Sequence, residues 1–357
     1  MWPDAELQGC RVNTHIPVAL KIADARWFPV DLHVPRREYR FLKIDDHVLE
    51  SSSFLDTRID ASLEQACPLP AEELVTPFLP SVGPGWLFHT SFCCSTLLAR
   101  LLHLPPQQVV LKEPLVLRRL ADARHAQWPG SHELIGPTVS LLARAWHAQG
   151  GVVIKPTHAA LNIAADLMAA SPASRAILLT SSLDDFLVSH LKKSEETLAK
   201  IPVLAERALA SGGFRGRLPA AAFQPPSFLA AAALQWAAQR ELCLDIIDSV
   251  GIQRVKVVDA STLLASVPQM VWQVSRWLQL PATAQALATR AAEVSTRNAK
   301  AVWAQYDASR RAADIGVLQA RFQQQLQAAS GWAKEFVLPF MRERSVGLGG
   351  EPGNPTW

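Results

Sequence analysis

The segment from Trp86 to Leu102 constrains the fold of this 357-residue chain more than any other. A short apolar run, Trp86 to Phe88, gives way to small and hydroxyl residues. Apolar residues at helical spacing follow, at Leu97, Leu98, Leu101 and Leu102. This pattern predicts a strand, a tight loop and a helix. Backbone amides at such a helix start can hold an anion. The segment therefore distinguishes an enzyme that uses a phosphorylated cofactor from an ordinary α/β domain.

Composition narrows the class of protein. Hydrophobic residues make up 49% of the chain, enough for a packed core, which excludes a disordered protein. The net charge of +3 comes from 35 basic and 32 acidic residues, so we expect no nucleic-acid partner and no membrane surface as partner. The apolar stretch around Phe228 to Ala238 is too short for a membrane span of ~20 residues.

Cysteine usage and the first residues suggest the compartment. The five cysteines are Cys10, Cys67, Cys93, Cys94 and Cys243. They form no CxxC pair and no Cys/His cluster with metal-ligand spacing, so no metal site is expected. The residues after Met1 lack the charged and apolar regions of a signal peptide. We therefore expect a cytoplasmic protein with reduced thiols.

The chain divides into three predicted parts. Residues 1–80 contain short β-like pieces such as Tyr39–Ile44 among several prolines, and predict a small β-rich or irregular region. Residues 81–345 form the main domain, and residues 346–357, rich in Gly and Pro, form a flexible tail. Strand-like and helix-like patterns alternate in the main domain, which predicts a three-layer α/β/α fold with a mainly parallel sheet. The expected strands are Trp86–His89, Val109–Lys112, Val152–Lys155, Ala176–Thr180 and Arg254–Val258; the expected helices are Thr96–His103, Leu115–Arg124, Glu133–Gln149, Leu161–Ala170, Leu183–Lys193, Phe228–Val250 and Gln269–Leu278.

Four segments, in order, resemble the P-loop-containing sulfotransferase family, whose members use 3′-phosphoadenosine 5′-phosphosulfate as sulfuryl donor. The family's loop reads Gly-x-Pro-Arg/Lys-Ser-Gly-Thr-Thr-Leu-Leu, and this chain has His-Thr-Ser-Phe-Cys-Cys-Ser-Thr-Leu-Leu at positions 89–98. Leu-Lys-Glu-Pro-Leu at 111–115 resembles the Glu-Pro segment of many bacterial members. Positions 178–189 resemble the family's third motif, which is a strand followed by Arg-Asp-Pro-x-Asp with a Ser eight residues after the Arg. Positions 254–281 resemble the family's late strand, the helix after it and its Leu-Gly-Leu-Pro ending. The chain is thus similar to a divergent bacterial-type member.

The resemblance implies a set of donor-binding residues. In the loop these are Ser91, Cys93, Cys94, Ser95 and Thr96, around the 5′-phosphosulfate. For the 3′-phosphate they are Ser181 and Ser189, with Arg297 or Lys300 from the late basic segment. Three positions depart from the family pattern: Phe92 replaces a basic residue, Cys94 a glycine and Ser181 an arginine.

Ordinary structural roles remain open for the same residues. Ser95 would cap the helix that follows the loop, and Ser181 or Ser182 the helix after the third motif. The paired cysteines are either small packing residues or a reactive thiol at a helix start. Without glycine, the loop is expected to resist positive φ and close approach to a ligand.

Three residues are candidates for catalysis. Glu113 follows the second expected strand and either acts as general base or stabilises the next helix start. Lys155 ends the third strand, where ligands bind in parallel sheets, and it or Lys112 would balance charge on the bridging oxygen. His158 follows it in Lys-Pro-Thr-His, similar to the Lys-Thr-His segment of cytosolic members, and rivals Glu113 as the base.

Three functions remain open from the sequence. The first, which the resemblance implies, is sulfuryl transfer to a hydroxyl or amine, with a small-molecule or peptide acceptor as the expected partner. The second is a nucleotide-dependent phosphotransferase, against which Ser95 stands where a loop lysine is needed. The third is a non-catalytic binding protein that kept the fold and lost the donor site.

Overall fold

The computed structural model describes residues 22–74, 83–296 and 308–342. Its centre is a five-stranded parallel sheet in the order β5-β6-β4-β7-β8. The predicted sheet is confirmed, and each strand lies within a residue of its predicted bounds. The strands are β4 (Gly85–His89), β5 (Gln108–Lys112), β6 (Gly151–Lys155), β7 (Ala176–Thr180) and β8 (Val255–Asp259).

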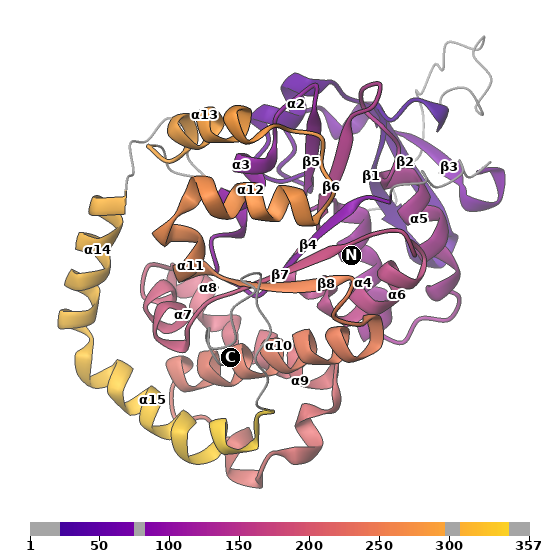
Figure 1. Ribbon diagram of the computed structural model, residues 1–357. Coiled ribbons are helices and arrows are strands. Elements are labelled where there is room, and N and C mark those ends of the chain that lie inside the picture. The colour runs from indigo at the N-terminus through magenta and orange to yellow at the C-terminus, as the bar shows by residue number, and fades with distance from the viewer. Residues whose placement is uncertain (1–21, 75–82, 297–307, 343–357) are drawn as a thin grey trace.

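Alternate residues of each strand pack into two different cores. Leu87 and Val110 contribute to one core, while Phe88 and Leu111 contribute to the other, because side chains alternate across a sheet. Both faces are therefore covered by helices, and Figure 1 shows α12 and α13 on one side of the sheet and α10 on the other. The first face carries α3 (Ser95–Leu102), α11 (Ala260–Ala265), α12 (Val267–Trp277) and α13 (Ala284–Val294); the second carries α4 (Leu115–His125), α5 (Ile135–Leu142), α6 (Ala164–Ala169) and α10 (Phe228–Val250).

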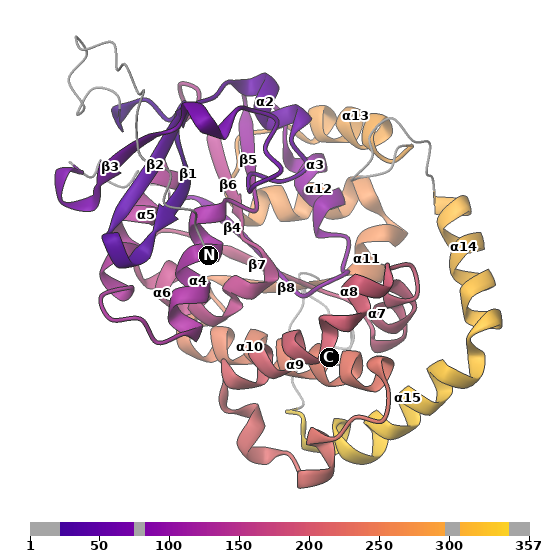
Figure 2. The same cartoon turned by 180° about the vertical axis from the view of Figure 1, so that it is seen from behind.

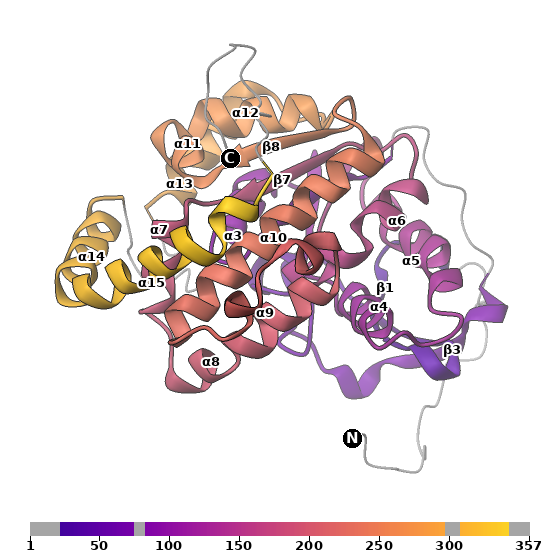
Figure 3. The same ribbon diagram turned by 90° about the horizontal axis from the view of Figure 1, so that it is seen from below.

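A third apolar cluster extends from the second face. The N-terminal half of α10 packs there against α7 (Leu183–His190) and α9 (Ile201–Ala210), with the short α8 (Glu195–Ala199) leading into α9. Seen from below, α15 (Gln323–Phe336) crosses α10, and α14 (Ala308–Arg321) lies at the periphery (Figure 3). The residue pattern of positions 317–344 predicts one or two helices; α15 lies within that segment, whereas α14 begins before it.

The N-terminal region folds as an antiparallel sheet with short helices. Its strands are β1 (Trp27–His33), β2 (Glu38–Lys43) and β3 (Cys67–Pro70), and α2 (Asp46–Ser51) follows β2. Residues of β1 and β2 belong to the same core as β4, β5 and α4, and Figure 2 shows this small sheet beside α5. The β-rich prediction is confirmed, while the boundary near residue 80 and the tail at 346–357 lie outside the described residues.

Three helix predictions were wrong in extent. The helix expected over Glu133–Gln149 ends at Leu142, because Arg144 turns its guanidinium onto main-chain oxygens of the N-terminal region, among them Asp24 O at 3.0 Å and Trp27 O at 2.8 Å. The helix expected over Leu161–Ala170 starts as a 3₁₀ helix, η5 (His158–Ile163), and becomes α-helical only at Ala164. The helix expected over Leu183–Lys193 ends at His190. In the first of these three cases tertiary contacts override local helical preference.

Candidate functional site

The loop between β4 and α3 adopts left-handed backbone without any glycine. Phe92 has φ 58° and Cys94 has φ 64°. Cys94 is the residue before the helix and makes no side-chain capping bond, so Ser95 is the first helical residue. The interpretation of Ser95 as the cap was therefore wrong, and so was the expectation that Cβ atoms would keep this loop from positive φ. The chain accepts the strain of about 1 kcal/mol or more that a non-glycine residue carries here.

Ser91 fastens this loop to α10. Its amide donates to Gln239 Oε1 at 3.0 Å, and its hydroxyl accepts from the Gln239 and Gln235 side-chain amides at 3.2 and 3.4 Å. The Ser91 amide is thus engaged within the protein. The amides of Ser95 and Thr96 lie in the first turn of α3, where helix geometry provides no main-chain acceptor, and they carry the positive end of the helix dipole. The Ser95 amide also meets the Cys93 sulfur.

Buried hydroxyls without partners lie where β4 and β7 end. Thr90 Oγ1 and Ser181 Oγ are shielded from solvent and meet no hydrogen-bond partner among the described residues, as does Gln235 Oε1 on α10. Buried polar groups normally have a partner. Because β4 pairs with both β6 and β7, this edge is the switch point of the sheet, where ligands of such folds bind. The residues present therefore fit a polar ligand at this point.

The remaining donor-site candidates lie either on or next to α7 or outside the described residues. Ser182 caps α7, accepting from the Asp185 amide at 3.1 Å, which confirms the capping prediction for this residue. Ser189 is partly buried in the last turn of α7. Arg297 and Lys300 lie outside the described residues.

The Cys93 thiol is a packing group. It is fully buried, and its Sγ lies 3.0 Å from Thr90 O. Burial raises the pKa of the Cys93 thiol to about 12. The reactive-thiol interpretation therefore fails for Cys93, because the thiolate is the nucleophile.

Phe92 holds a lysine beside the loop. Its ring contacts the rings of Phe186 and His190, with centroids 5.7 and 4.5 Å away. The Lys193 ammonium, just beyond α7, lies 4.9 Å from the centroid of the Phe92 ring, in cation–π geometry. Phe92, which replaces a basic residue of the family pattern, thus has the Lys193 ammonium against its ring.

A charged cluster occupies the neighbouring strand ends, β5 and β6. Lys155 Nζ lies 2.5 Å from Glu113 Oε1, and both side chains are largely buried. Burial alone would raise the pKa of the Glu113 carboxyl, but the adjacent Lys155 ammonium outweighs it and the pKa falls to about 2. Glu113 also has φ 55°, a strained value of the kind found at functional sites. Lys112 instead donates to Glu50 O at 3.4 Å, so Lys155 is the lysine that meets Glu113.

Two histidines border this pair. His89 at the end of β4 has its ring nitrogens 2.8 Å from Thr90 O and 2.9 Å from Pro156 O, and its Nε2 lies 3.9 Å from Glu113 Oε1. His158 begins η5, and its Nε2 is buried without a partner among the described residues. Burial lowers the pKa of His158 to about 4, with Arg118 and Arg207 adding to the effect, so the ring is neutral at neutral pH.

The N-terminal region reaches this edge of the sheet, which the sequence analysis missed. Leu55 N donates to Lys112 O at 2.6 Å, and Leu115 N donates to Leu55 O at 3.0 Å. The Phe54 ring consequently lies 5.9 Å from Lys155 Nζ and 4.0 Å from the Arg58 guanidinium. No periodic pattern marks residues 53–58, so no sequence signal pointed to them.

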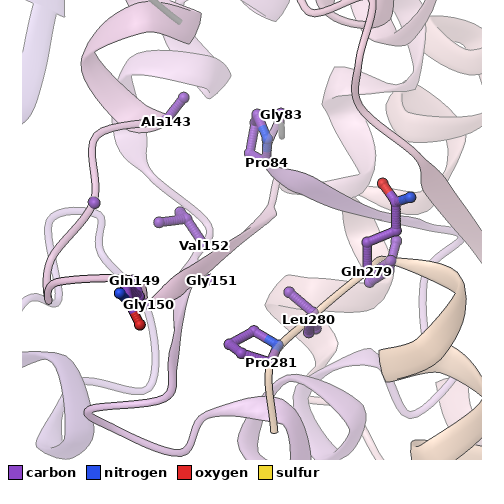
Figure 4. Close-up of a pocket in the computed structure, with 12 residues that line it drawn as sticks. Gly83, Pro84, Ala143, Gln149, Gly150, Gly151, Val152, Gln279, Leu280 and Pro281 are labelled. Carbon is purple, nitrogen blue, oxygen red and sulfur yellow. The ribbon is translucent and has the colours of Figure 1, made fainter. Parts of the chain in front are cut away.

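The hollow drawn in Figure 4 lies at the opposite edge of the sheet. It measures about 200 Å³ and is lined by the residues before β4 and β6 and by Leu278 to Pro281 after α12. Its walls are mainly apolar side chains and main chain. Its position, away from the loop and from Glu113, separates it from the chemistry of the candidate site.

Within residues 22–74, 83–296 and 308–342, no three His, Cys, Asp or Glu side chains gather as metal ligands would. Over the same residues, no helix combines the length and hydrophobicity needed to cross a membrane.

Comparison with solved structures finds several sulfotransferases. The sulfotransferase STF9 from Mycobacterium avium is similar with TM-score 0.39 and 12% identity over 70% of this chain and 77% of its own. The sulfotransferase domain from the curacin biosynthetic pathway has TM-score 0.39 and 14% identity, over 70% and 97%. A sulfotransferase from Alicyclobacillus acidocaldarius has TM-score 0.36 and 15% identity, over 70% and 98%. No family model and no curated protein matches the chain.

Proposed function

We propose that this protein transfers a sulfuryl group from 3′-phosphoadenosine 5′-phosphosulfate to a hydroxyl or amine acceptor. One observation carries the proposal. A helix start of the kind that can hold an anion follows β4 and adjoins a buried Glu113–Lys155 pair and a neutral histidine at the ends of β5 and β6. Sulfuryl transfer needs these two elements: a cradle for a charged donor and a group that takes the acceptor proton.

The donor would be held at the carboxyl ends of β4 and β7. The amides of Ser95 and Thr96, with Cys93 and Cys94 shaping the loop, would face the 5′-phosphosulfate, which supplies the sulfuryl group and leaves as a bisphosphate. Thr90 Oγ1 and Ser181 Oγ are buried acceptor–donor groups in need of a partner, and Ser189 lies on α7. Arg297 or Lys300 would complete the 3′-phosphate contacts.

Lys193 would supply the positive charge that Phe92 cannot. Its ammonium is held against the Phe92 ring, and a cation near this helix start would balance charge on the bound donor. Lys193→Gln should weaken binding of adenosine 3′,5′-bisphosphate about tenfold or more, and Phe92→Lys in that background should restore it. Lys192→Gln, at the exposed neighbouring position, is the matched control. Equal binding by the Lys193 and Lys192 variants would exclude this role.

His158 is the better of the two candidate bases. A base works best when its pKa lies near the working pH. The pKa of Glu113 is about 2 and its carboxylate is bound to Lys155, whereas His158 has a higher pKa, about 4, and an Nε2 without a partner among the described residues. In this scheme the acceptor oxygen or nitrogen bonds to sulfur, the bond from sulfur to the bridging oxygen breaks, and the acceptor proton passes to His158 Nε2. Glu113 positions Lys155, whose ammonium balances charge on the departing bridging oxygen.

The first test is ligand-induced thermal stabilisation. Adenosine 3′,5′-bisphosphate at ~100-fold excess over Kd should stabilise the protein by ~2.7 kcal/mol. Stabilisation by ATP with Mg²⁺ or by GTP, and not by the bisphosphate, would favour a phosphotransferase. Stabilisation by none of them would favour a binding protein that lost its donor site.

The second test assigns the base by transfer of radiolabelled sulfate to an acceptor panel. His158→Ala should lower kcat at least a hundredfold, the typical contribution of a general base, while the exposed His125→Ala keeps it. Glu113→Gln should also lower kcat, because Glu113 would no longer hold the Lys155 ammonium in place. Full activity of His158→Ala would remove His158 from the scheme.

A further inference from the structure

Four buried side-chain atoms without partners gather beside α4. Eleven such atoms occur among the described residues, and these four are Arg207 Nε and Nη2, His158 Nε2 and Asn162 Oδ1. Arg207 Nη1 contacts Asp122 on α4 at 2.5 Å, and Asn162 Nδ2 donates to Ala121 O on the same helix at 2.9 Å. Arg207 is also near enough to His158 for its charge to lower the pKa of that ring. Unmet donors and acceptors on residues packed around one helix indicate a polar ligand rather than isolated packing faults.

Arg207 contributes two of these four atoms, and their arrangement indicates which kind of ligand would fit. Its side chain is 14% exposed, and only its Nη1 side meets a carboxylate. The Nε–H and Nη2–H bonds point along one edge of the guanidinium, and neither finds an acceptor among the described residues. Leaving charged donors buried and unpaired is costly. That edge matches the two oxygens of a carboxylate, which accept two parallel hydrogen bonds.

The local charge also favours an anion. Asp122 is the carboxylate that contacts Arg207, and it is shared with Arg118, whose Nε lies 2.8 and 3.0 Å from its two oxygens. Two guanidinium groups thus divide one negative charge. The neighbouring Lys155 and Glu113 neutralise each other, and His158 is neutral. One positive charge remains uncompensated beside the proposed base.

We propose that the Nε–Nη2 edge of Arg207 is a subsite for a carboxylate carried by the acceptor, so that this protein acts on hydroxy or amino acids. The inference rests on the proposed sulfuryl transfer, because it names the acceptor class of that reaction. The carboxylate is held on α9, and the acceptor's hydroxyl or amine faces His158. A bound carboxylate would also offset Arg118 and Arg207, which lower the pKa of His158, and so make the base stronger when the acceptor is present.

The test measures acceptor binding by calorimetry without any donor. The probes are hydroxy acids of increasing length, each paired with its primary amide: 4-hydroxybenzoate, 4-hydroxyphenylacetate and 4-hydroxyphenylpropionate. The wild-type protein should bind at least one acid about tenfold tighter than its amide, a difference of ~1.4 kcal/mol. Arg207→Gln should abolish this preference. Arg207→Lys keeps the charge beside Asp122 and loses the two-donor edge, so it should fold normally and lose most of the preference.

The control variant is Arg215→Gln, which removes an exposed arginine just beyond α9 that pairs with Glu206. It should keep the wild-type preference for the acid. The inference is overturned if no acid is preferred to its amide, or if Arg207→Lys retains the full preference. Bisphosphate stabilisation distinguishes the two proposals. If it occurs without acid preference, the acceptor class is wrong and sulfuryl transfer stands; if the Arg207-dependent preference occurs without it, the carboxylate subsite stands and sulfuryl transfer falls.

Discussion

Cys94 shows how a residue other than glycine can adopt the left-handed backbone between a strand and a helix. Its φ of 64° belongs to the left-handed region, which branched side chains almost never adopt. Cys94→Gly should leave the free energy of unfolding unchanged within ~1 kcal/mol, because relief of strain offsets glycine's greater loss of entropy. Cys94→Val should destabilise by ~2 kcal/mol.

Denaturant unfolding of the two variants checks this order. Cys67→Val, on strand β3, is the control, since a branched residue suits extended backbone and should change stability by less than ~0.5 kcal/mol. A Cys94→Val protein as stable as the wild type would show that the loop is not left-handed in solution.

Glu113 gives the protein an acid-sensitive contribution to stability. Its folded-state pKa of about 2 lies below the ordinary 4.5, so the contribution is present above pH 4.5 and is lost as pH falls toward 2. The shift corresponds to ~3 kcal/mol. The wild-type protein should lose about this much more stability than Glu113→Gln over that range. Glu133→Gln, which removes an exposed carboxylate paired with Arg37, should follow the wild type, and parallel pH profiles for all three proteins would contradict the assignment.

At the scale of elements, the N-terminal sheet is part of the main core. Residues of β1 and β2 pack with α4 and α5, and Arg144 and Leu55 join the two regions through main-chain hydrogen bonds. Removing residues 1–74 should therefore expose the apolar faces of α4 and α5 and leave a protein without a cooperative unfolding transition.

Calorimetry of the whole chain and circular dichroism of the truncated chain check this prediction. The whole chain should unfold in one transition that includes β1 to β3. A separate early transition, or a truncated chain that unfolds cooperatively and binds the bisphosphate, would make the N-terminal region an independent unit.

The elements predicted best from the sequence are those whose side chains are buried on every face. The five strands of the parallel sheet are buried on both faces, so unbroken apolar runs such as Val109–Lys112 identify them. The end of α5 was not predictable, because it depends on Arg144 meeting carbonyls of a distant segment. The strand pattern pointed to Lys155, which ends β6, and to Glu113, which follows β5. No sequence signal pointed to Arg207, which lies within the amphipathic helix α9.

At the scale of the whole molecule, buried histidines should make the fold sensitive to mild acid. Burial lowers the pKa of His89 and His103 to about 3, and of His158 and His190 to about 4. Between these values and 6.5 the unfolded chain binds protons that the folded protein refuses, so stability falls as pH falls through this range. Together the four rings should cost ~5 kcal/mol between pH 7 and pH 5.5, a large share of a typical stability of 5–15 kcal/mol.

The slope of unfolding free energy against pH measures this proton uptake. It should indicate several protons bound on unfolding near pH 5.5, and His190→Leu should reduce the slope by about one proton. The exposed His125→Gln should leave it unchanged. A slope near zero in the wild-type protein would mean that these rings are charged in the folded state.

The hydrogen bonds of Leu55 have a consequence for the order in which this protein assembles. Leu55 bonds to Lys112 and Leu115, which are synthesised long after it. During translation the Phe54 segment therefore waits without its partners until β5 and the start of α4 emerge. Pairing between such distant segments slows folding, because the loop between them must close first. The Phe54 ring therefore cannot take its place before Leu115 emerges, and the Glu113–Lys155 pair that it borders must wait longer still, because Lys155 is synthesised after Leu115.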